Sequence, residues 1–251
     1  MNEIAKELPQ EDVVYFADSV HCPYGRRTYQ EIERLARGVV SFLLCQAAKV
    51  IVVACNTASA AALYHLRETF SVSIVGMEPA LKPAAAGTDS KVVGVIATEA
   101  TFQGALFASL VERFASDIEV LTQACPGLVE RVEAGFIEDA VTKEMLSEYL
   151  QPMLGAGIDS LVLGCTHYPF LKPLMREIVG GELEIIDPSL AVAQQTGRVL
   201  GREGLLREGG PGRYTFYTSG DPQVFARLIE GLTSLKGAVL GARWTGGEIV
   251  T

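Results

Sequence analysis

Residues 160 to 167 read Ser160-Leu161-Val162-Leu163-Gly164-Cys165-Thr166-His167. A short apolar run of this kind is typical of a β-strand that is buried on both faces. An earlier stretch has the same form and reads Ile51-Val52-Val53-Ala54-Cys55-Asn56-Thr57. In both stretches an apolar strand is followed by a small residue, a cysteine and hydrogen-bonding residues that open a helix or turn. We therefore expect two matching strand ends that each present a cysteine.

The same alternation of short apolar runs and helical periods extends through most of the chain. Strands that are apolar throughout and separated by helices indicate a parallel sheet covered on both sides, so we predict a doubly wound α/β fold. The predicted strands are 13–17, 50–54, 72–75, 92–97, 118–121, 160–164 and 184–187. The predicted helices are 29–45, 57–70, 103–114 and 138–154.

The last portion of the chain has a different pattern, with a helix over 191–205, an alternating strand over 213–217 and a helix over 222–232. The residues around Trp244 lack periodicity and read as a loose tail. The repeated cysteine motif predicts two domains related by pseudo-symmetry: residues 1–77 plus 190–251, and residues 78–189. Two similar halves that face each other would bring both cysteines to one interdomain cleft, where we expect the active site.

Composition excludes several classes of function. The formal net charge of −9 argues against a grip on nucleic acid or an anionic membrane. The start lacks a signal peptide, and no apolar run is long enough to span a membrane, so we expect a soluble, cytoplasmic protein. Five cysteines without a Cys-x-x-Cys pair favour a reducing compartment. No spacing fits a zinc site or a phosphate-binding loop, and we expect no metal and no cofactor.

A cysteine at the carboxyl end of a parallel strand lies where open α/β sheets bind ligands. The following helix N-terminus supplies backbone donors that bind carboxylates and lower a thiol pKa. The simpler interpretation is that each cysteine is a small buried hydrophobe. Two thiols in matched contexts instead suit the inversion of a carbon stereocentre, which needs a base on one face and an acid on the other. Such a pair would work without a cofactor.

The two motifs, Cys55-Asn56-Thr57-Ala58-Ser59 and Gly164-Cys165-Thr166-His167-Tyr168-Pro169, resemble the signatures of glutamate racemases. That family makes D-glutamate for peptidoglycan without a cofactor. Three further segments match the family, namely Cys22-Pro23-Tyr24-Gly25, Gly76-Met77-Glu78-Pro79 and Ala97-Thr98-Glu99-Ala100-Thr101.

The resemblance implies a role for each matching residue. Cys55 and Cys165 would be the two catalytic bases, and His167 would assist Cys165. Glu130 is a weaker match that would tune His167. The glutamate carboxylates and amine would be held by Tyr24, Gly25, Asn56, Thr57, Thr98, Thr101, Thr166 and His167. The resemblance also implies a homodimer.

The sequence departs from the family pattern at its start. The family opens with an apolar strand and an Asp-Ser-Gly turn that assists the first cysteine, and neither precedes Ile4 here. We therefore expect a chain that lacks a central strand and has reduced activity. Two alternatives stay open: an aspartate or hydantoin racemase of the same superfamily, and a non-catalytic, truncated protein that binds glutamate.

Overall fold

The computed structural model describes residues 1–181 and 183–251. The chain forms two compact units, which we describe separately. Unit 1 comprises residues 1–54, 61–77 and 189–251, and unit 2 comprises residues 55–60 and 78–188. The predicted α/β class with parallel strands is confirmed in both units. The predicted domain boundaries of 77/78 and 189/190 stay a prediction.

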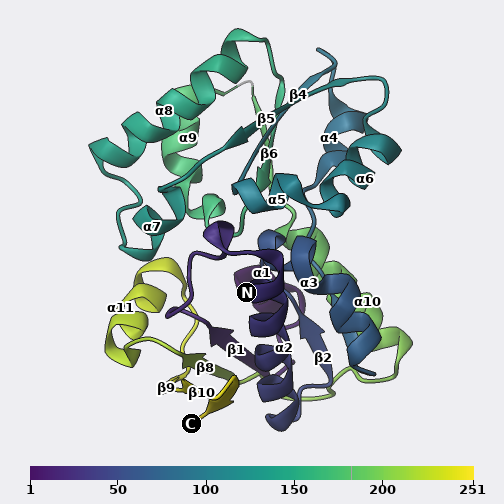
Figure 1. Cartoon of the computed structure of the whole chain (residues 1–251), viewed down its shortest axis with the longest axis vertical. Helices are drawn as coiled ribbons and strands as arrows, with labels where there is room; N and C mark the ends of the chain where they lie inside the picture. The colour runs from purple at the N-terminus through teal and green to yellow at the C-terminus, as the bar shows by residue number, and fades with distance from the viewer. Residues whose placement is uncertain (182) are drawn as a thin grey trace. The chain divides into compact units, whose positions relative to one another are not determined.

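Unit 2 is built on a parallel sheet in which β4 (Val92–Ala97) lies between β5 (Glu119–Ala124) and β6 (Ser160–Gly164). The edge strand β7 (Glu184–Ile186) pairs with β6. Val93 and Val95 point to one face and pack with buried residues of the helices there. In Figure 1, α4 and α6 lie on one side of this sheet and α8 and α9 on the other. The sheet is therefore covered on both faces, as its apolar strands predict.

The helices of unit 2 follow the strands in the expected alternation. The predicted helix over 103–114 is wrong in one respect, because Gly104 has an extended backbone and separates two helices, α5 and α6. The helical segments of the unit are α4 (Leu81–Gly87), α5 (Glu99–Gln103), α6 (Ala105–Phe114), α7 (Leu128–Glu133), α8 (Ala140–Gly155), η2 (Tyr168–Leu171) and α9 (Lys172–Val179).

Unit 1 contains two separate parallel sheets. In the first, β8 (Tyr214–Thr218) pairs with β1 (Val13–Ala17) and with β9 (Ala238–Gly241). In the second, β2 (Val50–Val52) pairs with β3 (Ser73–Val75). Within the described residues β1 and β2 do not pair with each other, so the parallel strands of this unit are interrupted between them.

The first sheet of unit 1 buries alternate side chains on its two faces. Tyr15 and Phe216 pack with Phe225 of α11, whereas Phe16 and Tyr217 pack on the opposite face with a residue of α2. This alternation is the period of two that a strand imposes. The helical segments of the unit are α1 (Asn2–Glu7), η1 (Tyr24–Arg26), α2 (Tyr29–Cys45), α3 (Asn56–Thr69, whose first residues count with unit 2), α10 (Ser189–Arg202) and α11 (Pro222–Leu232).

The C-terminal residues form ordered structure, and the prediction of a loose tail around Trp244 is wrong. Strand β10 (Arg243–Thr245) pairs with β11 (Glu248–Val250) in an antiparallel hairpin. The turn contains Gly246 and Gly247, whose φ angles of 60° and 95° lie in the left-handed region. Two residues with positive φ are what a tight hairpin turn requires, and glycine adopts them without steric cost.

Among the described residues, no helix combines the length and the apolar character that a membrane crossing requires.

We predict that Leu110→Ala destabilises unit 2 by about 2–5 kcal/mol, because its side chain fills the core between α6 and β4 and its removal leaves a cavity. Urea unfolding followed by circular dichroism measures the change. Leu190→Ala is the control: this leucine is 47% exposed, and we expect a change within about 0.5 kcal/mol. Equal effects of the two substitutions would contradict the assigned core.

Candidate active site

Cys55 lies at the beginning of α3, directly before the first helical residue. Its carbonyl oxygen accepts a hydrogen bond of 2.9 Å from the Ser59 backbone N–H, which starts the helix. The Ala58 backbone N–H points at the thiol, with the nitrogen 3.4 Å from Sγ. Backbone N–H groups of the first helical turn and the positive end of the helix dipole therefore face this sulfur and favour negative charge there.

Burial nevertheless raises the pKa of the Cys55 thiol above its ordinary value of 9.0. The Ala58 hydrogen bond opposes this increase, a negative charge on Cys165 adds to it, and a positive charge on His167 opposes it. Charges on Cys165 and on His167 therefore both act on the Cys55 thiol. All three belong to unit 2, as its first segment covers residues 55–60.

Three threonine hydroxyls join the Cys55 segment to the end of β4. The Thr57 hydroxyl lies 2.7 Å from that of Thr98 and 3.2 Å from that of Thr101, and the last two are 3.0 Å apart. Thr57 and Thr101 are buried. The structure thus brings together these three residues, which the family resemblance selected from distant parts of the sequence.

Asn56 is only 2% exposed, and neither its Oδ1 nor its Nδ2 has a hydrogen-bond partner among the described residues. A buried amide without partners costs free energy, on the order of 1–3 kcal/mol for each unsatisfied group. Such a group is well suited to a polar ligand, because an incoming carboxylate or amine would satisfy it. This unsatisfied amide is the clearest sign of a ligand site beside Cys55.

Cys165 follows β6 at the same edge of the sheet as Thr98. The register pairs Ala97 with Gly164, so the residues after them, Thr98 and Cys165, begin neighbouring loops. Gly164 approaches β4 closely: a Cβ atom there would lie 2.8 Å from the Ala97 Cβ and 3.0 Å from the Ile96 carbonyl oxygen. A larger residue would push the strands apart, and glycine at this position therefore keeps Cys165 at the sheet edge.

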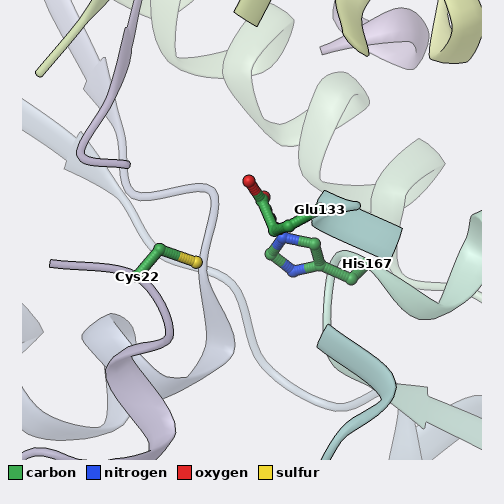
Figure 2. Close-up of side chains that lie close together, drawn as sticks. All are labelled: Cys22, Glu133 and His167. Carbon is green, nitrogen blue, oxygen red and sulfur yellow. Dashed lines mark hydrogen bonds and ion pairs between the residues drawn. The ribbon is translucent and has the colours of Figure 1, made fainter. Parts of the chain in front are cut away.

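His167 connects the second cysteine to a carboxylate. Its Nδ1 lies 3.8 Å from the Cys165 Sγ, and its Nε2 lies 2.7 Å from Oε1 of Glu133. Figure 2 shows the side chains of Glu133 and His167 close together; the other labelled residue, Cys22, belongs to unit 1. A carboxylate bonded to one ring nitrogen fixes the orientation of the imidazole, whose other nitrogen faces Cys165.

Glu133 is a residue that sequence reasoning missed, since the family resemblance pointed to Glu130. Both lie on α7, three positions apart, and a helix places such residues on the same side. Glu130 lies near Tyr168, whose pKa is raised first by burial and to a smaller extent by this carboxylate. The sequence contains no signal that distinguishes the two glutamates, and the role of Glu130 stays a prediction.

The remaining expected residues are Thr166, Tyr24 and Gly25. Thr166 is half-buried between Cys165 and His167. Tyr24 and Gly25 belong to unit 1, where they form the start of η1. The Tyr24 hydroxyl donates a hydrogen bond of 2.7 Å to Oδ2 of Asp18, which directly follows β1. The binding roles of these residues stay predictions.

The sequence of this chain is similar to those of known proteins. A sequence model of the Asp/Glu/Hydantoin racemase family matches residues 1–196. A glutamate racemase of Pseudomonas putida (strain GB-1) is 49% identical over 228 residues, which are 90% of this chain and 86% of that protein. Another, from Pseudomonas syringae pv. tomato, is 47% identical over 97% of this chain and 89% of its own length.

A solved structure is also similar. The Escherichia coli glutamate racemase, in complex with L-glutamate and the activator UDP-MurNAc-Ala, matches with a TM-score of 0.86 and 28% identity, covering all (100%) of this chain and 93% of that one. The predicted resemblance is confirmed by both kinds of comparison. On the cysteine motifs, the fold and these matches, the chain belongs to the Asp/Glu/Hydantoin racemase family.

Proposed function

We propose that this protein interconverts L-glutamate and D-glutamate without a cofactor, using Cys55 and Cys165 as the two bases. The observation that carries the proposal is the pair of thiols within one unit, one directly before α3 and the other directly after β6. The curated relatives are named glutamate racemases, and a similar solved structure contains L-glutamate.

The reaction requires one thiolate and one thiol. The thiolate removes the α-proton from one face of the substrate, and the thiol on the other face donates its proton to the resulting carbanion. The two sulfurs exchange protonation states, so the reverse reaction uses the same groups in opposite roles. His167, held by Glu133, is placed to stabilise the Cys165 thiolate.

Several polar groups near the two cysteines are available to bind the substrate. Asn56 offers an unsatisfied amide beside Cys55, and the hydroxyls of Thr57, Thr98 and Thr101 offer donors at the end of β4. We propose that these groups bind the carboxylates and the amine of glutamate. We propose the same role for Tyr24, Gly25, Thr166 and His167.

The product would supply peptidoglycan synthesis, which is the role of this family. The expected homodimer and the expected cytoplasmic location stay predictions. Light scattering of the purified protein tests the predicted homodimer.

Neither alternative function, an aspartate or hydantoin racemase or a non-catalytic glutamate-binding protein, has a specific structural observation in its favour.

We predict that the wild type incorporates deuterium from heavy water at the α-carbon of both glutamate enantiomers. Cys55→Ser and Cys165→Ser each lower racemisation at least about a thousandfold, because a hydroxyl is a far weaker acid than a thiol. In each variant the remaining thiol still exchanges one enantiomer, and the enantiomer differs between the two.

Proton NMR and circular dichroism measure exchange and inversion. L-Aspartate serves as the substrate control, and faster inversion of aspartate than of glutamate would favour the alternative racemase. Glutamate binding without exchange at either enantiomer would identify a non-catalytic protein. Full racemisation by either serine variant would contradict the two-base mechanism.

We predict that Glu133→Gln lowers kcat roughly tenfold or more, because the neutral amide no longer stabilises a protonated His167. The pH profile of kcat should change as well, which a purely structural effect would not produce. Glu130→Gln is the matched control on the same helix, and we expect a smaller effect. If Glu130→Gln is the more damaging of the two, the family-based assignment is correct and the contact with Glu133 is not functional.

We predict that alkylation of Cys55 by iodoacetamide keeps accelerating above pH 9.0, its ordinary pKa. Burial raises the pKa of this thiol, so the reactive thiolate forms only at a higher pH than in an unfolded chain. Peptide mass spectrometry after timed labelling measures the rate, with the same protein in urea as the control. A plateau at or below pH 9.0 in the folded protein would contradict the assigned environment.

A further inference from the structure

Asp18 is the centre of a hydrogen-bond cluster in unit 1. It directly follows β1, and its side chain is only 7% exposed. Its carboxylate accepts hydrogen bonds from the Tyr24 hydroxyl at 2.7 Å, the Ser219 hydroxyl at 2.9 Å and the Trp244 Nε1–H at 2.8 Å. His21 Nδ1 lies 3.0 Å from both carboxylate oxygens. We call these five residues the Asp18 cluster.

The Asp18 cluster joins three parts of the chain that are distant in sequence. His21 and Tyr24 lie in the loop after β1, Ser219 lies directly after β8, and Trp244 lies on the C-terminal hairpin. Two carboxylate oxygens offer about four lone-pair directions, and four side chains occupy them. The position of each partner is therefore coupled to the others through one buried carboxylate.

Trp244 is held on more than one side. Its ring lies against Gly38 of α2 so closely that a Cβ atom there would be 2.6 Å from the indole. Its ring also meets His21 edge to face, at 5.3 Å between centroids and 82° between planes. The indole is thus fixed by packing, and its N–H is aimed at Asp18. Packing against a helix makes it a rigid support for the carboxylate.

From these contacts we propose that Asp18 and Trp244 are positioning residues, through which the C-terminal hairpin holds the Tyr24–Gly25 loop in the conformation that binds substrate. This inference rests on the proposed function, in which Tyr24 and Gly25 contact glutamate. Oδ1 of Asp18 receives the indole and Ser219, while Oδ2 receives Tyr24. A rigid carboxylate transmits any shift on one side to the other.

A hydrogen bond within the loop fixes its far end, at Arg27. Arg27 donates from Nε to the His21 carbonyl oxygen at 2.7 Å, so the loop is closed by its own backbone. Once Asp18 fixes His21 and Tyr24, little freedom is left between them. The predicted consequence of removing Trp244 is therefore a displaced Tyr24 with an intact loop fold.

The first test is Trp244→Phe, which keeps an aromatic ring against Gly38 but removes the N–H donor. We expect the KM for glutamate to rise about tenfold, with kcat changed less than about twofold, because a binding contact is displaced while both thiols stay in place. Tyr217→Phe is the matched control. It removes a hydrogen bond from the Tyr217 hydroxyl to Gln46, 3.2 Å long, in the same unit but outside the Asp18 cluster. Equal KM values for the two variants would overturn the proposal.

The second test asks whether Trp244 acts through Asp18. Asp18→Asn replaces one carboxylate oxygen with a donor and so breaks the cluster. We expect Trp244→Phe to change KM less than about twofold in the Asp18→Asn background, because the two substitutions interrupt the same connection. Independent, multiplicative effects of the two substitutions would show that Trp244 acts by another route, and would overturn the proposal.

A third measurement does not depend on catalysis. Trp244 is the only tryptophan in the chain, so the intrinsic fluorescence reports on this cluster alone. Tyr24→Phe should shift the Trp244 emission in the absence of glutamate, whereas Tyr217→Phe should not. No shift with Tyr24→Phe would overturn the coupling. If Tyr24→Phe shifts the emission but the wild-type protein neither binds nor racemises glutamate, the proposed function is refuted and the coupling stands.

Discussion

Three threonine hydroxyls hold the first cysteine segment against the sheet that carries the second. Thr57 follows Cys55 on α3, and its hydroxyl contacts those of Thr98 and Thr101 at the end of β4. Since β4 and β6 are paired in register, the same edge presents Cys165. This contact is a polar connection between residues 55–60 and the end of β4. The proximity of two thiols therefore depends on buried hydroxyl contacts as well as on the sheet.

The two cysteines occupy different electrostatic surroundings. Burial raises the pKa of Cys55, although backbone N–H groups and His167 oppose the increase. Cys165 instead has an imidazole beside it, and that imidazole is joined to Glu133. In the proposed two-base reaction each sulfur must be able to exist both as a thiolate and as a thiol, because the reverse reaction exchanges their roles. The helix start lies at one sulfur and the His167–Glu133 pair lies at the other, so the two thiols have different neighbours.

In unit 1, as in unit 2, polar side chains gather at the carboxyl ends of neighbouring parallel strands, and the Asp18 cluster is an example. The carboxyl end of β1 presents Asp18, and the end of β8 presents Ser219 beside it because the two strands are parallel neighbours. Functional side chains gather at such strand ends, where loops rather than pleated backbone surround them. The C-terminal hairpin adds Trp244 to this edge. A segment that looked unstructured in sequence thus contributes to the most highly connected carboxylate of the unit.

The sequence by itself determined the α/β class, most strand positions and the two cysteine motifs, because apolar periodicity and helix-start chemistry are local properties. It selected Thr98 and Thr101 through family resemblance, but their contact with Thr57 arises only when β4 is folded. Tertiary structure alone revealed the contact between Glu133 and His167, since that depends on how α7 docks beside the Cys165 loop. It also decided that Ser219 and Trp244 converge on Asp18, because those contacts join residues more than two hundred positions apart and no local pattern encodes them.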